Sequence, residues 1–402
     1  MRKRHLVAIA FLTALNVLNY FDVSIISAVG PSMKRDLGLS DASFGLVGST
    51  FLYGYILSGP FFGVLMSRFN RVRLLALSVA VWSISLASTG YVRLFALIVV
   101  LRIVAGVAQS AFVSMSPTLL DELVTARIKS KVFSIFYAAI PIGTALGFIY
   151  AGYMDERVGW PMAFLLAGLF GLVLVPLFLK LPQEANETTQ AALSKIFVHH
   201  LKSLLESHRF MLTVMGYAAQ TFALGGFAFW APTYISRVLG YPLGLGNTVF
   251  GSILALTGFA GTLIGGVVAD HWKGPDQSGN YLKASTLFTL IAIPFAFLAL
   301  ALRSDVAFFA CMAVVEMAIF ATLSPITLVF MRAAPFAARA TAIGLSIFIG
   351  RLLGDASSIW LVGLISDKTS DLTVGMYILP AALVINLFLW LPAIRARQSR
   401  EL

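Results

Sequence analysis

Charged residues are scarce in this sequence. Asp, Glu, Lys and Arg together make up 12% of the 402 residues, which is about half of their share in ordinary soluble domains. Hydrophobic residues make up 59%, more than a soluble domain of this length usually carries. The single cysteine, Cys311, lies in an apolar stretch, which excludes an intramolecular disulfide and a multi-cysteine metal site. The composition indicates a membrane protein.

Motifs for catalysis and for nucleotide binding are also missing. No Gly-x-x-x-x-Gly-Lys-Ser/Thr loop is present to bind ATP phosphates, so ATP-driven pumping is not indicated. No combination of nucleophile, base and metal ligands can be recognised in the sequence, so we expect that the protein is not an enzyme and has no cofactor. His199, His200 and His208 lack Cys or acidic neighbours at metal-binding spacing. The net charge of +11 is spread over loops, which argues against a nucleic-acid partner.

The apolar residues occur in blocks of about twenty, the length a helix needs to cross a bilayer. The alternation of apolar and polar residues that marks a membrane β-barrel strand is not seen. We therefore predict an all-α polytopic membrane protein with twelve spans, at residues 7–29, 43–66, 72–92, 94–117, 131–154, 160–180, 209–236, 246–270, 282–302, 305–333, 339–365 and 373–394.

The distribution of basic residues predicts the orientation of these spans. Loops and tails on one side carry 20 Lys and Arg, those on the other side carry 7, and Arg102 and Arg351 fall within spans. Because cytoplasmic loops are enriched in Lys and Arg, both termini are predicted to be cytoplasmic. The basic N-terminus resembles a signal peptide, but its apolar run continues to about Val29 without a cleavage site. We interpret it as the first retained span of a multi-pass cell-membrane protein.

A long polar interruption divides the sequence into two halves. We predict an N-terminal six-helix bundle at 1–180, a cytoplasmic linker at 181–208 and a C-terminal six-helix bundle at 209–402. Within the linker, apolar residues at helical spacing predict an amphipathic helix on the membrane surface, which is either a plain connector or a regulatory element. These apolar residues are Ile196, Phe197, Leu201, Leu204 and Leu205.

The two halves resemble each other in sequence. Ser-Ile-Phe follows Arg127 at 134–136 and follows Arg339 at 346–348, an offset of 212 residues. Parallel repeats of this kind place a cavity between the halves near the bilayer midplane. Chance similarity between apolar helices is the alternative. We assign a gating or conformational role to charged residues near the predicted cytoplasmic ends of the spans, namely Arg68, Arg71, Arg127, Asp270 and Arg339.

Ionisable residues within spans are functional candidates, because an isolated charge in lipid costs several kcal/mol. Asp22 lies in the first span and Arg102 in the fourth, where they can form a pair. Burial favours the neutral form of a carboxyl group and a nearby Arg favours the charged form, so this pair can load and release a proton. The structural alternative is a static ion pair that fixes helix packing.

Two further groups of residues stand out in the second half. Arg351 and Asp355 are four residues apart, so they either neutralise each other or leave Arg351 to bind an anion. Glu316 has no helical neighbour of opposite charge and is either protonated at rest or in contact with the cavity. Aromatic residues that include Phe229 and Trp230 crowd the seventh span, where they either line an apolar cavity or face lipid.

Motifs along the chain resemble the Spinster lipid transporters of the major facilitator superfamily. Asn19-Tyr20-Phe21-Asp22 looks like the family's Asn-Tyr-x-Asp-Arg, and Arg102 is matched in the fourth span. Other matches are Ser134 to Tyr137, Ile140 to Gly143, Leu146-Gly147, Trp230 to Pro232, Glu316, Leu352 to Ala356 and Gly363 to Asp367.

The resemblance implies a carrier of amphipathic lipids such as lysophospholipids or sphingoid phosphates, which works by alternating access. It implies proton coupling at Asp22, Arg102 and Glu316, and no other cofactor than a proton gradient. Val23 stands where the family has Arg, and Gln109 where it often has Glu. Because Gln109 cannot titrate, coupling rests more heavily on Asp22 or is absent. We assign substrate binding to Tyr20, Arg102, Gln109, Phe229, Trp230, Arg351 and Asp355.

Three other interpretations remain open at this stage. The same fold can serve efflux of drugs or other organic ions, and a non-transporting receptor or scaffold is an alternative of another class. A membrane enzyme is a more distant one. We expect a monomer in a bacterial inner membrane, with membrane lipids and a small amphipathic or other organic substrate as partners.

Overall fold

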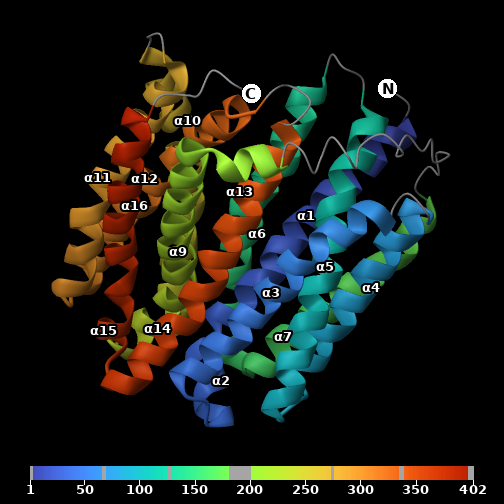
Figure 1. Ribbon diagram of the computed structural model, residues 1–402. Coiled ribbons are helices and arrows are strands. Elements are labelled where there is room, and N and C mark those ends of the chain that lie inside the picture. Colours follow the sequence, from blue (N-terminus) through green and yellow to red (C-terminus); the bar gives the residue numbers. More distant parts are fainter. Residues whose placement is uncertain are drawn as a thin grey trace. The chain divides into compact units, whose positions relative to one another are not determined.

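The computed structural model is built from helices in the residues that it describes (Figure 1). It describes residues 3–65, 69–124, 128–180, 201–272, 276–334 and 339–396, and no β-strand occurs in these ranges. The helices are α1 (Lys3–Ala28), α2 (Gly30–Leu37), α3 (Asp41–Leu65), α4 (Arg71–Thr89), α5 (Phe95–Leu123), α6 (Lys129–Val158), α7 (Trp160–Leu174), the 3-10 helix η1 (Val175–Lys180), α9 (His208–Arg237), α10 (Leu243–His271), α11 (Gln277–Ala301), α12 (Asp305–Arg332), α13 (Arg339–Leu353), α14 (Asp355–Thr369), α15 (Leu372–Met376) and α16 (Ile378–Arg395).

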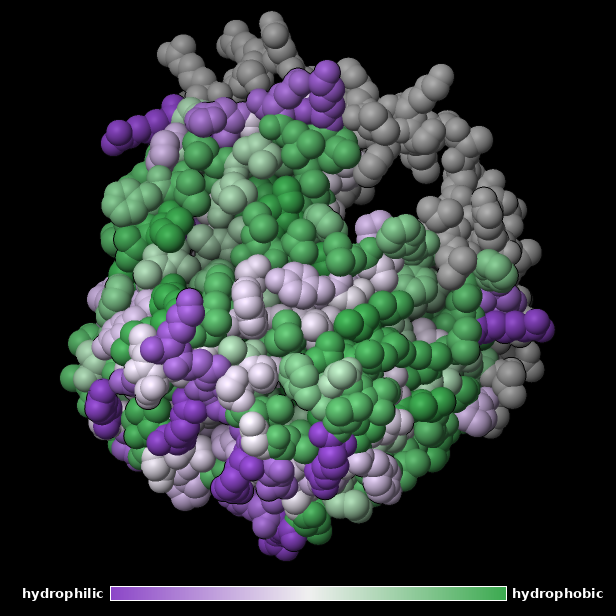
Figure 2. Space-filling model, turned by 60° about the horizontal axis from the view of Figure 1, so that its bottom comes forward, coloured by the Kyte–Doolittle hydropathy of each residue, from purple (hydrophilic) through white to green (hydrophobic). Residues whose placement is uncertain are grey.

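The predicted membrane spans coincide with these helices. Among the described residues, eleven segments are long and apolar enough to cross a membrane. The twelfth predicted span, 43–66, coincides with α3, a helix of 25 residues. Large apolar side chains lie exposed on these helices, for example Phe61 at 74%, Leu256 at 72% and Val306 at 73%. Figure 2 shows hydrophobic side chains across much of the visible face, as expected of a surface solvated by lipid.

The chain divides into two compact units, each described here by itself. Unit 1 comprises Met1–Thr188 and Ile235–Ala255, and unit 2 comprises Thr189–Tyr234 and Leu256–Leu402. The division therefore falls within two continuous helices, at the C-terminal end of α9 and in the middle of α10.

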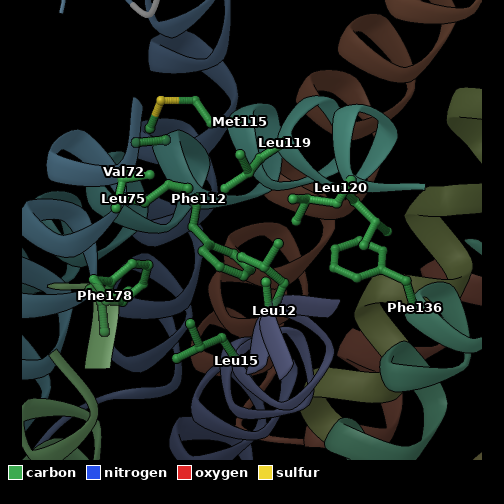
Figure 3. Close-up of a cluster of buried hydrophobic side chains, with 14 of the residues drawn as sticks. Leu12, Leu15, Val72, Leu75, Phe112, Met115, Leu119, Leu120, Phe136 and Phe178 are labelled. Carbon is green, nitrogen blue, oxygen red and sulfur yellow. The ribbon is translucent and has the colours of Figure 1, made fainter. Parts of the chain in front are cut away.

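In unit 1, α1 packs along α6, α3 along α5, and α4 against both α5 and α7. Because lipid is as apolar as Leu, helices in a membrane associate through close packing rather than the hydrophobic effect. Gly143 and Gly147 of α6 allow close packing against α1, because a Cβ on either residue would collide with a backbone carbonyl of α1. A buried cluster from α1, α4, α5, α6 and η1 fills the space between the helices (Figure 3).

In unit 2, α11 packs along α12 and α16. Gly261 and Gly265 of α10 allow a similarly close approach, because a Cβ on either would collide with the backbone of α12. The buried cluster of this unit includes Phe210, Phe330 and Trp390. The indole of Trp390 donates a hydrogen bond to the Thr213 carbonyl at 3.0 Å.

Three predicted spans differ in detail from the observed helices, and one of them, 373–394, is divided at Tyr377 into α15 and α16. Span 339–365 was expected as one helix, but it is broken at Gly354 into α13 and α14, with φ −91° and ψ −98° at that residue. The end of span 160–180 tightens into η1. Proline at 176 explains the tightening, because it removes a hydrogen-bond donor of an α-helix.

The predicted linker lies mainly outside the described residues, together with Ile196, Phe197, His199 and His200. Its last part, 201–206, is helical. There Leu204 is buried, while Lys202 and Glu206 are exposed with Nζ and Oε1 3.8 Å apart. This part therefore has one apolar and one charged side. The boundaries of the two predicted bundles stay a prediction.

Candidate functional site

A row of polar side chains lies on one buried face of α1. Asn16, Asn19 and Asp22 are spaced three residues apart, which places them near one face of a helix. They are 3%, 2% and 1% exposed. Asn16 Nδ2 donates to the Phe136 carbonyl of α6 at 2.9 Å. Among the described residues, the side-chain carbonyl of Asn19 has no hydrogen-bond donor.

The Asp22 carboxylate is the last member of this polar row along α1. Neither of its oxygens has a hydrogen-bond partner among the described residues. The Trp82 indole of α4 lies beside it without completing a hydrogen bond, and the charge of Arg102 acts on it from α5. The two charges form no direct ion pair. The structure therefore brings Asp22 and Arg102 into one site, but not into contact.

Arg102 is held against an aromatic ring. Its guanidinium carbon is 4.5 Å from the centre of the Phe51 ring of α3, and the residue is 3% exposed. Gly106, one turn further along α5, lets the backbone of α3 approach closely. Gln109 follows two turns after Arg102 and is 2% exposed, with a side-chain carbonyl that has no donor among the described residues.

Several buried polar atoms of this cluster in unit 1 have no hydrogen-bond partner among the described residues. A buried carboxylate or amide without a partner is costly in a packed interior. A group of such residues is stable where water, a proton or a ligand completes it. Asp22, Asn19 and Gln109 are therefore able to receive a polar ligand or a proton, and Arg102 supplies a fixed positive charge beside them.

A second charged cluster lies in unit 2 at the break between α13 and α14. Arg351 Nη1 and Asp355 Oδ2 are 3.7 Å apart, so the predicted proximity is observed although Gly354 interrupts the helix between them. The Gly350 carbonyl just before the break accepts two hydrogen bonds, from the Gly354 amide at 2.8 Å and from Thr221 Oγ1 of α9 at 2.7 Å. One Asp355 oxygen has no hydrogen-bond partner in the part of the chain that the structure describes.

Helix α9 packs closely against this pair. A Cβ on Gly225 would lie 2.9 Å from the Asp355 side chain, so the glycine makes room for the carboxylate. The charges of Arg351 and Asp355 also act on the phenol of Tyr217. The cluster therefore combines one cation, one anion and a hydroxyl at an interrupted helix, a geometry that transporters use for polar ligands.

Glu316 of α12 is isolated from both clusters. It is fully buried, and neither carboxylate oxygen has a hydrogen-bond partner among the described residues. The amide nitrogen of Gln220 donates elsewhere on α12, to the Ile319 carbonyl at 3.1 Å and to the Thr322 hydroxyl, while the Gln220 side-chain carbonyl has no donor among the described residues. Glu316 is thus a second carboxyl group whose stable state requires a proton or another partner.

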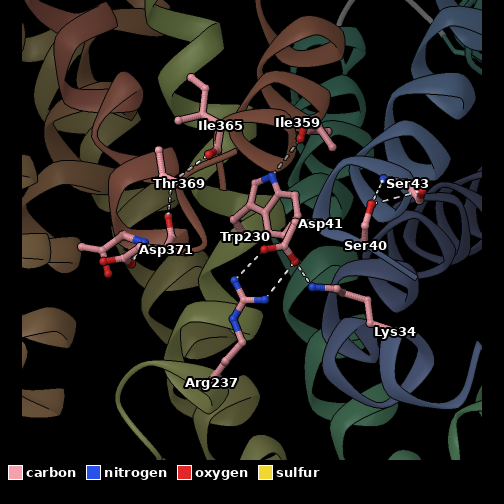
Figure 4. Close-up of polar contacts among 11 residues, drawn as sticks. Lys34, Ser40, Asp41, Ser43, Trp230, Arg237, Ile359, Ile365, Thr369 and Asp371 are labelled. Atoms are coloured by element: carbon pink, nitrogen blue, oxygen red, sulfur yellow. Dashed lines mark hydrogen bonds and ion pairs between the residues drawn. The ribbon is translucent and has the colours of Figure 1, made fainter. Parts of the chain in front are cut away.

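The aromatic residues predicted to line a cavity take part in helix packing. Trp230 is fully buried, and Phe229 is 6% exposed. The Trp230 indole donates to the Ile359 carbonyl of α14 at 2.9 Å (Figure 4). The rings of Phe229 and Trp230 meet edge to face with centres 5.5 Å apart. Lipid-facing positions are therefore excluded for both residues.

The remaining predicted residues lie apart from the buried clusters. Tyr20 is half-buried on α1, and Asp270 is exposed near the end of α10. Arg71 begins α4 and Arg339 begins α13. Arg68 and Arg127 lie outside the described residues.

Sequence reasoning missed a charged cluster in unit 1 around Asp41, the first residue of α3. Arg237 at the end of α9 donates to both carboxylate oxygens, with Nη1 to Oδ1 at 2.9 Å and Nη2 to Oδ2 at 2.7 Å. Lys34 of α2 contacts the same carboxylate (Figure 4). The Asp41 side chain is only 5% exposed, and a bidentate Arg–carboxylate pair of this kind is strong. Its two ends are 196 residues apart, so sequence spacing gave no signal.

Further contacts of unit 1 join α9 and α10 to the first part of the chain. Asn247 Nδ2 donates to the Ala28 carbonyl at 2.9 Å, and both groups are buried. The Gly244 amide donates to Glu156 Oε1 at 2.7 Å. Residues 235–255 are therefore held to α1, α3 and α6 by several polar contacts.

Outside the membrane-spanning segments, Asp276 is the best-defined ionised group of unit 2. It caps α11 by accepting from the Gly279 amide at 2.8 Å, and it pairs with Arg209 at 2.8 Å. Partial burial opposes ionisation, but the Gly279 amide and Arg209 outweigh it and lower the pKa of Asp276. This group stays charged at neutral pH.

No cluster of three or more potential metal ligands occurs within the part of the chain that the structure describes. His208 begins α9 without a group of acidic or sulfur ligands around it.

Comparisons with known proteins agree with this architecture. The sequence profile described as Major Facilitator Superfamily matches residues 12–358. Protein spinster homolog 1 of Xenopus laevis is 28% identical over 413 residues, which cover 96% of this chain and 78% of that protein. The sphingosine-1-phosphate transporter SPNS2 of Danio rerio is 28% identical, over 91% of this chain and 77% of its own.

Among solved structures, the chain is similar to a bacterial homologue of the human lysosomal transporter Spinster in an inward-facing, unoccupied conformation. The TM-score is 0.86 at 18% identity, and the match covers 98% of both chains. At this identity the likeness shows the fold.

Proposed function

This chain belongs to the Major Facilitator Superfamily, and on that basis we propose that it is a secondary transporter that moves an amphipathic lipid across a membrane by alternating access. The predicted all-α polytopic fold is confirmed, as is the predicted resemblance to Spinster proteins. The protein is thus a multi-pass membrane transporter and not an enzyme.

The observation that carries this proposal is the buried charge at Asp22 and Arg102 within membrane-spanning helices. Each is 3% exposed or less, and they do not neutralise each other by direct contact. Lipid does not tolerate such charges, so a static packing role explains them poorly. A passage that admits water and substrate in part of the transport cycle gives both a stable environment.

The lipid substrate class rests on the relatives. The names of those relatives include sphingosine-1-phosphate and sphingolipid transporters. Such molecules combine an apolar chain with a charged head. Arg102 and Arg351 are the cations we assign to an anionic head, with Tyr20, Gln109, Phe229, Trp230 and Asp355 as further substrate-binding residues.

Proton coupling is assigned to Asp22, assisted by Arg102, with Glu316 as a second carboxyl group. Binding of a lipid head near Arg102 reduces the effect of that cation on Asp22, so the carboxylate takes up a proton more readily. Opening to water on the other side reverses the change. Protonation and substrate binding are then linked through one cluster.

Alternating access requires that contacts on one side break while that side opens. We assign this role to the Asp41 cluster, together with the predicted residues Arg68, Arg71, Arg127, Asp270 and Arg339 at the other end. Two six-helix bundles, 1–180 and 209–402, joined by a cytoplasmic linker at 181–208, would be the moving parts. We further propose that the protein is a monomer in a bacterial inner membrane, with both termini in the cytoplasm.

The test is uptake of a lysophospholipid into proteoliposomes that contain the purified protein, with and without an inward proton gradient. We expect gradient-driven flux in the wild type and loss of at least tenfold in Asp22→Asn, because the amide cannot carry the proton. Glu206→Gln, which changes an exposed carboxylate of the linker helix, is the matched control and should transport normally.

Three results would overturn parts of the proposal. Gradient dependence that persists in Asp22→Asn removes the coupling role of Asp22. Flux of hydrophobic organic cations without lysophospholipid flux favours the efflux carrier. Lysophospholipid binding without flux favours a receptor.

A further inference from the structure

A groove on the surface of unit 1 is separate from the buried clusters. It has a volume of about 550 Å³, within the range of roughly 300–1,000 Å³ that small-molecule sites occupy. Apolar side chains of α1, α6 and α10 line it, among them Phe21, Leu146, Ile149 and Leu245. Leu146 and Leu245 are about half exposed, at 47% and 51%, so the groove opens toward the lipid.

The long axis of the groove follows α6. Its lining residues on this helix run from Leu146 to Glu156, and Arg157 follows in the last turn. Eleven residues of helix rise by roughly 16 Å, which is about half of a 30 Å hydrocarbon core. The groove therefore has the depth of one leaflet, the depth that an acyl chain of that leaflet occupies.

The outer end of the groove carries a positive charge. The guanidinium carbon of Arg157 lies 4.6 Å from the centre of the Tyr153 ring, and Tyr153 lines the groove. Arg157 forms no ion pair among the described residues. Tyr and Arg at the end of a membrane helix lie at the level of the lipid head groups, the level at which lipid phosphates are found.

The acidic residue at the same end does not cancel that charge. Glu156 lines the groove, but one of its oxygens accepts the Gly244 amide at 2.7 Å. Gly244 lies in the first turn of α10, where the helix dipole is positive and stabilises a carboxylate. One Glu156 oxygen is thus engaged by a backbone amide, and neither Glu156 nor Asp155 forms an ion pair with Arg157 among the described residues, so the Arg157 guanidinium is available to a ligand.

The inner end of the groove is closed by two rings. Phe21 and Tyr150 lie with their ring centres 4.9 Å apart, and the Tyr150 hydroxyl donates to the Ala163 carbonyl at 3.1 Å. The hydroxyl is therefore occupied, and the rings present an apolar floor. A hydrocarbon chain fits this end, and a polar head group does not.

We propose that this groove binds one anionic phospholipid of the bilayer, with an acyl chain between α6 and α10 and its phosphate at Arg157. The bound lipid contacts α10 at Leu245 and Thr248, close to the contacts that hold residues 235–255 to the rest of unit 1. It is a bilayer component rather than the transported molecule, and the inference does not depend on which substrate is carried.

The test is a lipid titration of the delipidated, full-length protein followed by native mass spectrometry. Phosphatidylglycerol is the anionic probe, and phosphatidylcholine and lysophosphatidylglycerol are compared with it. We expect Arg157→Gln to bind phosphatidylglycerol about fivefold more weakly, the effect of one basic residue at an anionic membrane surface. Leu146→Trp, which fills the groove, should weaken binding of both diacyl lipids.

Arg93→Gln is the matched control. Its guanidinium also lies over an aromatic ring, 5.0 Å from the centre of Trp160, but neither residue lines the groove. Binding by Arg93→Gln should equal that of the wild type. If Leu146→Trp does not fold, Leu245→Trp tests the same space.

Equal losses in Arg157→Gln and Arg93→Gln would show nonspecific attraction and overturn the inference. Unchanged binding in a folded groove-filling variant would overturn it as well. Preference for lysophosphatidylglycerol over the diacyl lipid would make the groove an entry site for substrate, which also contradicts the proposal. All three readouts are independent of transport, so failure here leaves the proposed function untouched.

Discussion

At the scale of single residues, the molecule is defined by polar groups that its own interior does not satisfy. Asp22 and Glu316 are buried carboxyl groups whose oxygens have no hydrogen-bond partner in the described ranges. Most buried polar groups of proteins are paired, so an unpaired one at membrane depth requires an explanation. We propose exchange of a proton or contact with substrate as that explanation.

A pH prediction concerns Asp276, which lies outside the membrane. Its pKa is lowered in the folded protein from the ordinary value of 3.8 because the Gly279 amide and Arg209 outweigh its partial burial. The stabilisation is therefore complete above pH 3.8 and is lost as the pH falls through the lower folded value. The Asp276 side chain is 47% exposed, so we expect Asp276→Asn to cost less than about 1 kcal/mol.

Thermal unfolding of the wild type and Asp276→Asn in detergent, measured between pH 7 and pH 3, checks this expectation. The difference in melting temperature should shrink as the pH falls below 4. A difference that stays constant over this range would contradict the electrostatic origin, because Asn can still cap the helix.

The conspicuous residues of the sites were predictable from the sequence, and their partners were not. Asp22, Arg102 and Glu316 stand out because charge is rare within apolar runs. The Trp82 indole beside Asp22 and the Phe51 ring beside Arg102 do not stand out in the sequence, because aromatic residues are common in such spans. Only the packing of the helices shows which aromatic residues lie beside the charges. The Asp41 cluster was missed because its residues lie at helix ends, where charges are ordinary.

At the scale of helices, spans were predictable because their lengths follow from bilayer thickness. The break at Gly354 was not, because Gly also occurs within unbroken membrane helices. Only the structure shows it, together with Thr221 of α9, which donates to the Gly350 carbonyl beside the break. The predicted proximity of Arg351 and Asp355 is observed. The expected unbroken helix between them is not, because the helix is interrupted at Gly354.

The close packing of α1 and α6 gives a test at this scale. Gly147→Leu should destabilise the protein by about 1–3 kcal/mol, the usual cost of overpacking, because the new side chain collides with the Phe21 carbonyl. Gly344→Ala is the control, since a Cβ at that position of α13 meets no atom within 4 Å. Melting temperature and yield of monodisperse protein provide the measurement.

Gly344→Ala should be as stable as the wild type or slightly more so, because Ala loses less entropy in a helix than Gly. Equal stability of Gly147→Leu and Gly344→Ala would show that the helices adjust freely and that close packing does not hold α1 to α6.

At the scale of the whole molecule, the division into units at 234/235 and 255/256 is informative. Residues 235–255 group with the first part of the chain through Asp41–Arg237, Ala28–Asn247 and Glu156–Gly244. We interpret these contacts as those that must open on one side of the membrane during transport.

Removing the Asp41 carboxylate should loosen this region. Asp41→Asn leaves Arg237 and Lys34 without their shared anion, and charged hydrogen bonds of this kind contribute about 1.5–3 kcal/mol. We expect hydrogen exchange of residues 235–247 to accelerate by about tenfold or more. Asp36→Asn, which affects a hydrogen bond to Trp160 and no contact of Arg237, should leave the exchange of that segment unchanged.

Equal hydrogen exchange of residues 235–247 in Asp41→Asn and in the wild type would contradict this prediction. The Asp41 cluster would then not hold this region closed, and other contacts would control the opening.

The central claim is that the buried charges at Asp22 and Arg102 face a passage that water reaches. The most direct measurement is reaction of Gln109→Cys, in a Cys311→Ser background, with a membrane-impermeant thiol reagent added from either side. We predict labelling that is modulated by lysophospholipid, because Gln109 lies two turns after Arg102 on α5 and is buried in the present conformation. A folded variant that is not labelled from either side, with or without lipid, would contradict the account.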